Sequence, residues 1–200
     1  MGNTMTEKEK MLAGIPYDCG DKELLQQWHK AKALLFNFNS TPSTEKNKLD
    51  ELLYQLLGRR GNHLWISAPF FCDYGENIFI GENSEINYNC VFLDCNKITI
   101  GKNALIGPSV QIYTAFHPLK ASERIQKIKN EDDINMIFCK TQSAPINIGD
   151  NVWIGGGSII LPGVNIGNNV TIGAGSVVTK SIPSDTLAYG NPCVSIKSLK

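Results

Sequence analysis

Hydrophobic residues follow two different periods along the 200-residue chain. Up to about residue 60, leucines and other apolar residues recur three and four positions apart, which is typical of amphipathic helices. Thr6 and Glu9 form a capping-box pattern, and Asp21 can cap the helix that follows it. We therefore predict an N-terminal helical segment over residues 1–60, packed on a larger body. Its helices are expected in KEKMLAG, KELLQQWHKAKALLFNF and TEKNKLDELLYQLLG.

Beyond Ile66 the hydrophobic period changes to six residues. A period of six suits neither a helix nor an alternating strand, and is typical of a parallel β-helix in which each hexad makes one short strand and a turn. We predict an all-β main domain of stacked hexads over residues 61–185, followed by a C-terminal tail over 186–200. The hexads begin at Ile80, Ile86 and Phe92, at Ile100, Ile106 and Ile112, and at Ile148, Ile154, Ile160, Ile166, Ile172 and Val178.

The six-residue period breaks in two places. The step from Ile80 to Ile100 is twenty residues, two more than three hexads, which predicts a small outward bulge near LDCNKI. From about 117 to 145 the chain is heavily charged and contains no hexads, so we predict an external loop there. Long insertions in compact repeats commonly carry function. We expect this one to form a flap over a neighbouring subunit's active site.

Composition and charge exclude several kinds of partner. Nineteen Lys and Arg balance 19 Asp and Glu, so no basic field attracts nucleic acid or an anionic membrane. The six cysteines form no C-x-x-C pair, and no apolar run suggests a signal peptide or a membrane span. We expect a soluble cytoplasmic protein with reduced thiols. MGNTMT fits a pattern for N-myristoylation of Gly2, but the pattern is short and Met5 could be the original start.

Several motifs, in a fixed order after TEKEKMLAG, give the chain a specific resemblance to a known family. They are FFCDYGENIFIG, TAFHP, INIGDNVWIGG, LPGVNIG, AGSVVTKSIP and GNPC. Together they resemble the maltose and galactoside O-acetyltransferases among the hexapeptide-repeat acyltransferases, and the likeness fails only within about 119–144. The resemblance implies a left-handed β-helix and a homotrimer with active sites between subunits. It also implies acetyl-CoA as donor, a sugar hydroxyl as acceptor, and no metal.

The histidine of TAFHP, His117, falls on the catalytic histidine of that family. Independently, an imidazole can take a proton from a hydroxyl near neutral pH, and this one stands where the coil opens into the insertion. The resemblance implies direct transfer, in which the activated hydroxyl attacks the thioester and a backbone N–H stabilises the oxyanion. No cysteine falls in a recognised nucleophile motif, so we expect no acetyl-enzyme.

The resemblance also indicates acceptor-binding residues. Asn87 in INYNC and Asp73 in CDYG match acceptor positions, and Asp18 lies next to another. Asp94 and Cys95 lie at a further acceptor position, where a carboxylate binds a sugar hydroxyl well and a thiol binds it poorly. Each of these carboxylates and amides could instead cap a turn. The identity of the sugar therefore stays open.

Small residues and lysines match the coenzyme A groove of the family. Small side chains suit a narrow pantetheine channel, although the hexad turns also require them, and a lysine can bind a coenzyme phosphate. Trp153 either flanks this groove or packs against the insertion. Val194 and Lys197 stand where the galactoside enzymes carry arginines, so we expect either weaker donor binding or coenzyme phosphates that are held by other residues. The predicted donor-binding residues are Gly107, Gly156, Ala174, Thr179, Lys180 and Lys197.

The same fold can also serve other functions. A γ-type carbonic anhydrase needs three histidines in its repeats to hold zinc, whereas His29 and His63 lie upstream of the hexads and only His117 lies within them. A noncatalytic trimeric scaffold stays open because the insertion and the tail differ from the galactoside enzymes, although His117 and Asn87 argue against it. Acetyl transfer to an amino sugar also stays open.

Overall fold

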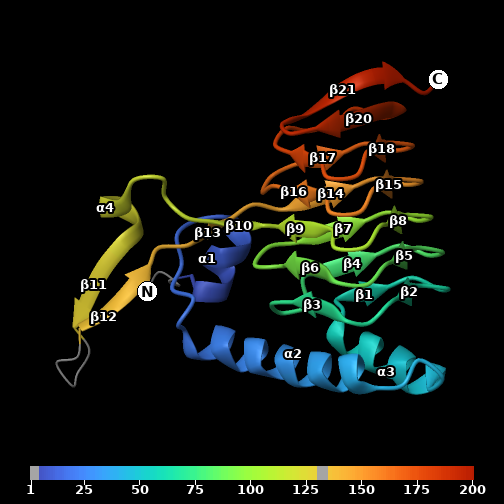
Figure 1. The fold of residues 1–200 in the computed structure, drawn as a ribbon. Helices are drawn as coiled ribbons and strands as arrows, with labels where there is room; N and C mark the ends of the chain where they lie inside the picture. The colour runs from blue at the N-terminus through green and yellow to red at the C-terminus, as the bar shows by residue number, and fades with distance from the viewer. Residues whose placement is uncertain (1–4, 130–134) are drawn as a thin grey trace.

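Three helices open the chain, as predicted. The structure is a computed structural model that describes residues 5–129 and 135–200, so Gly2 and its possible lipidation lie outside the described residues (Figure 1). Thr6 and Glu9 form the expected capping box, and the Asp21 carboxylate accepts the N–H groups of Glu23 and Leu24 in the first turn of the second helix. The helices are α1 (Glu7–Ala13), α2 (Lys22–Ser40) and α3 (Lys46–Leu56).

The rest of the chain winds through three sheets of short strands, which stack as coils of a prism (Figure 1). The first sheet contains β1 (Arg59–Arg60), β4 (Ile78–Ile80), β7 (Ile98–Ile100), β14 (Ile146–Ile148) and β17 (Asn165–Ile166). The second contains β2 (Trp65–Ile66), β5 (Glu85–Ile86), β8 (Leu105–Ile106), β15 (Trp153–Ile154), β18 (Thr171–Ile172), β20 (Thr186–Gly190) and β21 (Cys193–Ser198). The third contains β3 (Phe70–Cys72), β6 (Cys90–Leu93), β9 (Gln111–Tyr113), β16 (Ile159–Ile160) and β19 (Val177–Val178).

Within the three sheets the strands pair in parallel, except for the antiparallel pair β20 and β21 at the last coil. This arrangement confirms the predicted fold class, an all-β main domain built as a left-handed parallel β-helix of hexapeptide repeats with an N-terminal helical segment. Residues after 185 add β20 and β21 to the second sheet and so cover the end of the prism. Among the described residues, no helix has the length and apolarity that a membrane span needs.

The residue that opens each hexad points into the prism. Ile86 and Ile106 are aligned in neighbouring strands, as are Ile106 and Ile154, and all three are almost completely buried. Burying one such side chain stabilises the fold by about 1.5–3 kcal/mol. At the bottom of the prism, Asn39 of α2 donates to the carbonyl of Phe70 and accepts its N–H, both at 2.9 Å, so α2 covers the edge of the first coil (Figure 1).

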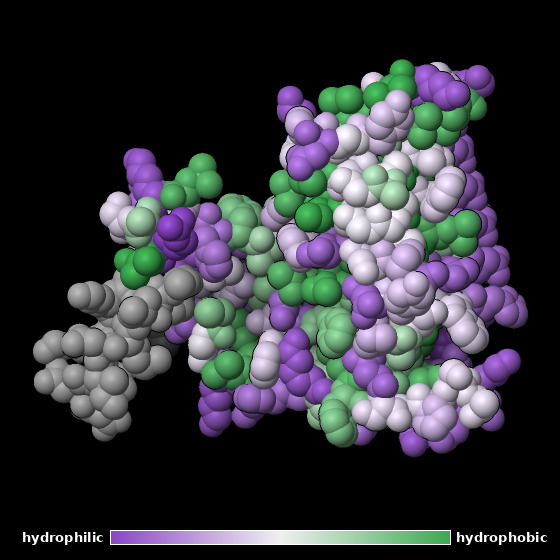
Figure 2. All heavy atoms as spheres, viewed as in Figure 1, coloured by the Kyte–Doolittle hydropathy of each residue, from purple (hydrophilic) through white to green (hydrophobic). Residues whose placement is uncertain are grey.

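A column of stacked asparagines runs along the corner between the first and second sheets. Asn83, Asn103, Asn151 and Asn169 all have φ between 55° and 58°, and each amide donates to the next residue of the column, ending at Asp185. Asparagine tolerates this left-handed conformation better than most residues. Figure 2 shows hydrophilic residues along the right-hand edge of the stack of coils. The column therefore holds successive turns together through side-chain amides.

The corner between the third and first sheets is enlarged in three successive coils. The step from Phe92 to Ile100 is eight residues, whereas the aligned step from Ile160 to Ile166 is six, so the predicted bulge is confirmed within residues 94–97. The preceding coil has the same enlargement at residues 73–77, which the sequence analysis missed.

The external insertion leaves from this enlarged corner. It has more secondary structure than the loop we predicted, because the backbone on both sides of residues 130–134 pairs as an antiparallel hairpin that projects from the prism (Figure 1). A second antiparallel pair connects its two ends to the coil. The elements are β10 (Ala115–Phe116), α4 (Ala121–Arg124), β11 (Ile125–Lys129), β12 (Asn135–Cys139) and β13 (Gln142–Ser143).

Candidate active site

His117 lies just after β10, at the start of the insertion, and its side chain is exposed. Its Nδ1 is 2.8 Å from the carbonyl oxygen of Lys140, which directly follows β12 of the insertion. Because a carbonyl only accepts hydrogen bonds, Nδ1 must carry the proton. In the neutral ring, Nε2 then has a free lone pair. The insertion therefore holds the imidazole in the tautomer that a general base needs.

A hollow of about 310 Å³ opens at the same corner. The backbone N–H of Tyr17 donates to the carbonyl of Thr141 at 3.3 Å, so the segment before α2 joins the insertion at one wall of the hollow. Thr141 directly follows Lys140, which connects this wall to the histidine. The hollow is lined by Tyr17, Cys19, Leu25, Trp28, Asp73, Tyr74, Cys95 and Thr141. Aromatic rings and one carboxylate suit a ligand with apolar faces and hydroxyl edges.

Asp73 is held at both of its carboxylate oxygens. Oδ1 lies 3.5 Å from Nζ of Lys32, and the Cys95 thiol lies 3.7 Å from Oδ2, at hydrogen-bonding distance for sulfur. Lys32 also donates to the carbonyl of Cys72 at 2.5 Å, and its Nζ is 4.7 Å from the centre of the Trp28 ring. One lysine of α2 thus contacts both the carboxylate and an aromatic wall of the hollow.

The thiol of Cys95 and the phenols of Tyr17 and Tyr74 are neutral. Burial raises the pKa of Cys95 to about 12, and the charge of Asp73 adds to the effect. Burial also raises the pKa of Tyr17 and of Tyr74 well above the ordinary tyrosine value. A neutral, buried thiol is a poor nucleophile. Cys95 is therefore unsuited to carry an acetyl group.

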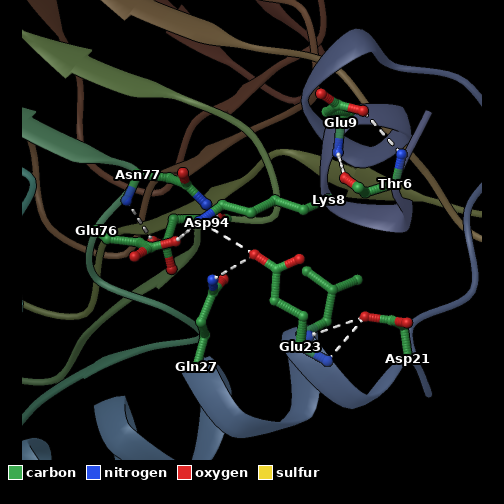
Figure 3. Close-up of polar contacts among 10 residues, drawn as sticks. Thr6, Lys8, Glu9, Asp21, Glu23, Gln27, Glu76, Asn77 and Asp94 are labelled. Atoms are coloured by element: carbon green, nitrogen blue, oxygen red, sulfur yellow. Dashed lines mark hydrogen bonds and ion pairs between the residues drawn. The ribbon is translucent and has the colours of Figure 1, made fainter. Parts of the chain in front are cut away.

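Asp94 does not line the hollow, although we expected it to bind the acceptor. Its side chain is completely buried beneath residues 73–77. Oδ1 accepts the N–H groups of Asp73 at 2.9 Å and Tyr74 at 2.8 Å, and Oδ2 accepts that of Asn77 at 3.3 Å. Figure 3 shows Asp94 beside Asn77. Burial raises the pKa of Asp94 to about 7. In this structure the carboxylate supports the turn that carries Asp73.

Charged side chains join both helices to the same turn. Lys8 of α1 lies 2.8 Å from a carboxylate oxygen of Glu76 and 4.0 Å from one of Glu23 of α2 (Figure 3). Gln27, one helical turn further along α2, donates to Glu23 at 3.1 Å. These contacts position α1 and α2 relative to residues 73–77, and thereby position Trp28 relative to Asp73.

Asp18 lies between two residues that line the hollow, Tyr17 and Cys19, but it is not itself part of the lining. Its side chain is exposed, and Oδ1 accepts the N–H of Gly20 at 2.8 Å. Its own N–H donates to Glu7 at 2.6 Å. The carboxylate caps a turn here. The predicted residue, Asp18, is therefore adjacent to the lining, and Tyr17, which forms part of it, was not predicted.

Three of the six predicted donor residues, Gly107, Gly156 and Ala174, lie with the predicted acceptor residue Asn87 at a different corner, between the second and third sheets. Asn87 donates its N–H to Ile106, and a Cβ added to Gly107 would lie 2.6 Å from the backbone nitrogen of Gly156, so these residues stack closely. Ala174 follows in the next coil. Asn87 precedes a strand of the third sheet, whereas His117 follows one. The two sets therefore lie at opposite edges of that sheet.

The remaining predicted donor residues are spread further. Thr179 and Lys180 follow β19, at the same corner as His117 but in a later coil. Lys197 lies in β21 and lines a shallow hollow of about 320 Å³ near the C-terminus, while Val194 of the same strand is exposed. Trp153 is exposed on the outer side of the second sheet. In the part of the chain that the structure describes, no cluster of three His, Cys, Asp or Glu side chains could hold a metal ion.

Two family models match the chain, one in its N-terminal helical segment and one in its hexapeptide repeats. The maltose acetyltransferase hexapeptide capping motif matches residues 10–61. The bacterial transferase hexapeptide (six repeats) matches residues 145–180. A putative acetyltransferase of Dictyostelium discoideum is 47% identical over 199 residues, which cover 100% of this chain and 97% of that protein.

Two solved structures match over almost the full length. A maltose O-acetyltransferase from Clostridium difficile 630 has a TM-score of 0.90 and 47% identity, covering 99% of this chain and 100% of that one. A galactoside acetyltransferase in complex with coenzyme A has a TM-score of 0.89 and 34% identity, and the match covers 98% of this chain and 92% of that one.

Proposed function

Because the chain belongs to the maltose and galactoside O-acetyltransferase family of hexapeptide-repeat proteins, and is thus an acetyl-CoA-dependent acetyltransferase, we propose that it acetylates a hydroxyl group of a sugar. The observation that carries the proposal is the tautomer of His117. Its Nδ1 donates to Lys140, which leaves Nε2 able to take a proton beside a hollow that suits a sugar ring. A general base near an acceptor pocket is what hydroxyl acetylation requires.

The proposed reaction is direct transfer. Nε2 of His117 removes the proton of the acceptor hydroxyl as its oxygen attacks the thioester carbon of acetyl-CoA. A backbone N–H stabilises the oxyanion, the C–S bond then breaks, and the imidazolium returns its proton to the leaving thiolate. The carbonyl of Lys140 keeps the ring oriented throughout, since it accepts from Nδ1 in both protonation states. Direct transfer agrees with the high pKa of the Cys95 thiol.

We assign the acceptor to the hollow and the donor to the coils beside it. Asp73 binds an acceptor hydroxyl and Cys95 borders the sugar. Asp94 does not contact the sugar and instead holds the turn that carries Asp73. Asn87 binds the acceptor from the opposite corner. The donor contacts are assigned to Gly107, Gly156, Ala174, Thr179, Lys180 and Lys197. We place the reaction in the cytoplasm.

The separation of these residues favours a site shared between subunits. His117 and the hollow lie at one edge of the third sheet, whereas Asn87, Gly156 and Ala174 lie at the other. A second copy that places its far corner against the hollow would bring the two sets together. A homotrimer, with three such contacts closed by symmetry, satisfies this requirement.

Complementation tests the shared site. Ala174→Trp places a bulky ring on an exposed turn and should block donor binding, while His117→Ala removes the base. If the two residues act from different subunits, mixed oligomers of the two inactive variants regain activity at about a quarter of their sites, because each site needs one particular variant on each side. A site contained in one chain gives no recovery.

The acceptor class is tested by acetyl-CoA consumption with glucosides, galactosides, maltose and amino sugars. The proposal predicts consumption with at least one uncharged sugar and an O-acetyl product by mass spectrometry and NMR. Preference for an amine over every hydroxyl would contradict it and indicate an N-acetyltransferase. No transfer to any sugar would contradict it as well, and would favour a noncatalytic scaffold.

A further inference from the structure

The ammonium group of Lys32 contacts three neighbours next to the hollow. Nζ donates to the carbonyl of Cys72 at 2.5 Å, lies 3.5 Å from Oδ1 of Asp73, and sits 4.7 Å from the centre of the Trp28 ring. The Lys32 side chain is 35% exposed and that of Asp73 is 22% exposed. The ammonium group is therefore positioned by three neighbours, two of which, Asp73 and Trp28, line the hollow.

This contact sets the charge of the hollow. Asp73 is the one charged side chain among the described residues that line it. The ammonium of Lys32 offsets the charge of this carboxylate from one side, and the neutral thiol of Cys95 faces it from the other. A hydroxyl can still donate to the carboxylate. A cationic group that approached Asp73 would also approach Lys32, and like charges repel.

We propose that Lys32 is a specificity-determining residue that favours uncharged, hydroxyl-bearing acceptors and rejects sugars that carry a protonated amine. The inference rests on the proposed function, since it concerns the choice of acceptor at the same site. Specificity often depends on an element that repels the wrong ligand, and Lys32 supplies such an element. Without it, Asp73 would be an unpaired carboxylate in an aromatic hollow, which is a favourable environment for a cation.

Lys32→Met tests the proposal, because methionine keeps most of the apolar stem and loses the charge. The assay compares kcat/KM for methyl glucoside and for its 2-amino-2-deoxy analogue, at a pH where the amine is protonated. We expect the variant to shift the ratio toward the amino sugar by about fivefold, the upper range for a partly exposed ion pair. Lys32→Arg keeps the charge and should keep the wild-type ratio. Lys30→Met, an exposed lysine of the same helix, is the matched control.

Asp73→Asn separates the electrostatic role from a structural one. If Lys32 acts through the charge at Asp73, Lys32→Met added to Asp73→Asn should leave the ratio unchanged. The affinity for acetyl-CoA, measured by calorimetry, should be the same in all variants. An active Lys32→Met variant with the wild-type ratio, or with equal losses for both sugars, would overturn the inference alone. Failure of the wild-type protein to acetylate any sugar would overturn the proposed function, and this inference with it.

Discussion

Replacing Asp94 with asparagine should remove a pH dependence of stability that originates in one buried carboxyl group. The side chain is completely buried, and its oxygens accept N–H groups from Asp73, Tyr74 and Asn77. Burial outweighs these hydrogen bonds and raises the pKa from the ordinary value of 3.8 to about 7. An asparagine of similar shape can keep the two hydrogen bonds to Oδ1, and it cannot ionise.

The sign of this pH dependence is set by whether the folded or the unfolded state binds the proton of Asp94. Between pH 4 and pH 7 the unfolded chain has lost the proton of Asp94, whereas the folded protein still binds it, so stability falls as the pH rises through this window. A difference of about 3 pKa units at about 1.4 kcal/mol each corresponds to about 4 kcal/mol across the window. The contribution is fully present below pH 4 and is lost above pH 7.

Urea unfolding at pH 4, 5.5 and 7, at one protein concentration, measures this effect. The free energy of unfolding of the wild-type protein relative to Asp94→Asn should decrease steadily with pH. Asp150→Asn is the control, because Asp150 also accepts a backbone N–H at a coil corner but is only half-buried. A flat difference, or one that increases with pH, would show that the three N–H donors keep Asp94 ionised and would refute the reasoning.

Three further predictions concern stability, donor and insertion. Asn151→Ala should lower the free energy of unfolding by about 1–2 kcal/mol, because alanine is strained at φ 57° and cannot bridge Asn103 and Asn169 in the amide column. Asn151→Gly removes the same hydrogen bonds without the backbone strain, so its loss should be smaller, and equal losses would contradict this explanation. Val194→Arg should tighten acetyl-CoA binding by about tenfold in calorimetry, through a charge-assisted bond to a phosphate, and no gain would mean that other residues bind the phosphates. Replacing residues 125–139 with a short linker should raise the KM of the acceptor and leave Tm nearly unchanged; a large loss of Tm with unchanged kinetics would refute a role over the site.

The sequence predicts the β-helix well because its period records which side chains face the core. Ile106 and Ile154 are aligned in the structure as their shared place in the hexad requires. Helix boundaries at Thr6 and Asp21 are also predictable, since capping depends on neighbouring residues. Both signals are local or strictly periodic, so no knowledge of distant contacts is needed.

The lining of the hollow is less predictable, because it depends on contacts between distant segments. Tyr17, Trp28 and Thr141 come together from the segment before α2, from α2 itself and from the insertion. Trp28 belongs to an apolar stripe that we interpreted only as packing. Asp94 shows the converse problem: the family resemblance places it at an acceptor position, whereas its complete burial and its hydrogen bonds to residues 73–77 show that it holds a turn.

The kcat of His117→Ala tests the central claim most directly, namely that a histidine in this tautomer is the base for acetyl transfer. The side chain is exposed and lies outside the hydrophobic core, so the stability of the protein and its affinity for acetyl-CoA should change little. His63→Asn is the control, because asparagine also tolerates the left-handed backbone of this exposed residue, which lies at the corner between the first and second sheets and not at the corner of His117. We predict that kcat falls by about two to four orders of magnitude in His117→Ala and is unchanged in the control. A folded His117→Ala variant with near-native kcat would contradict the account.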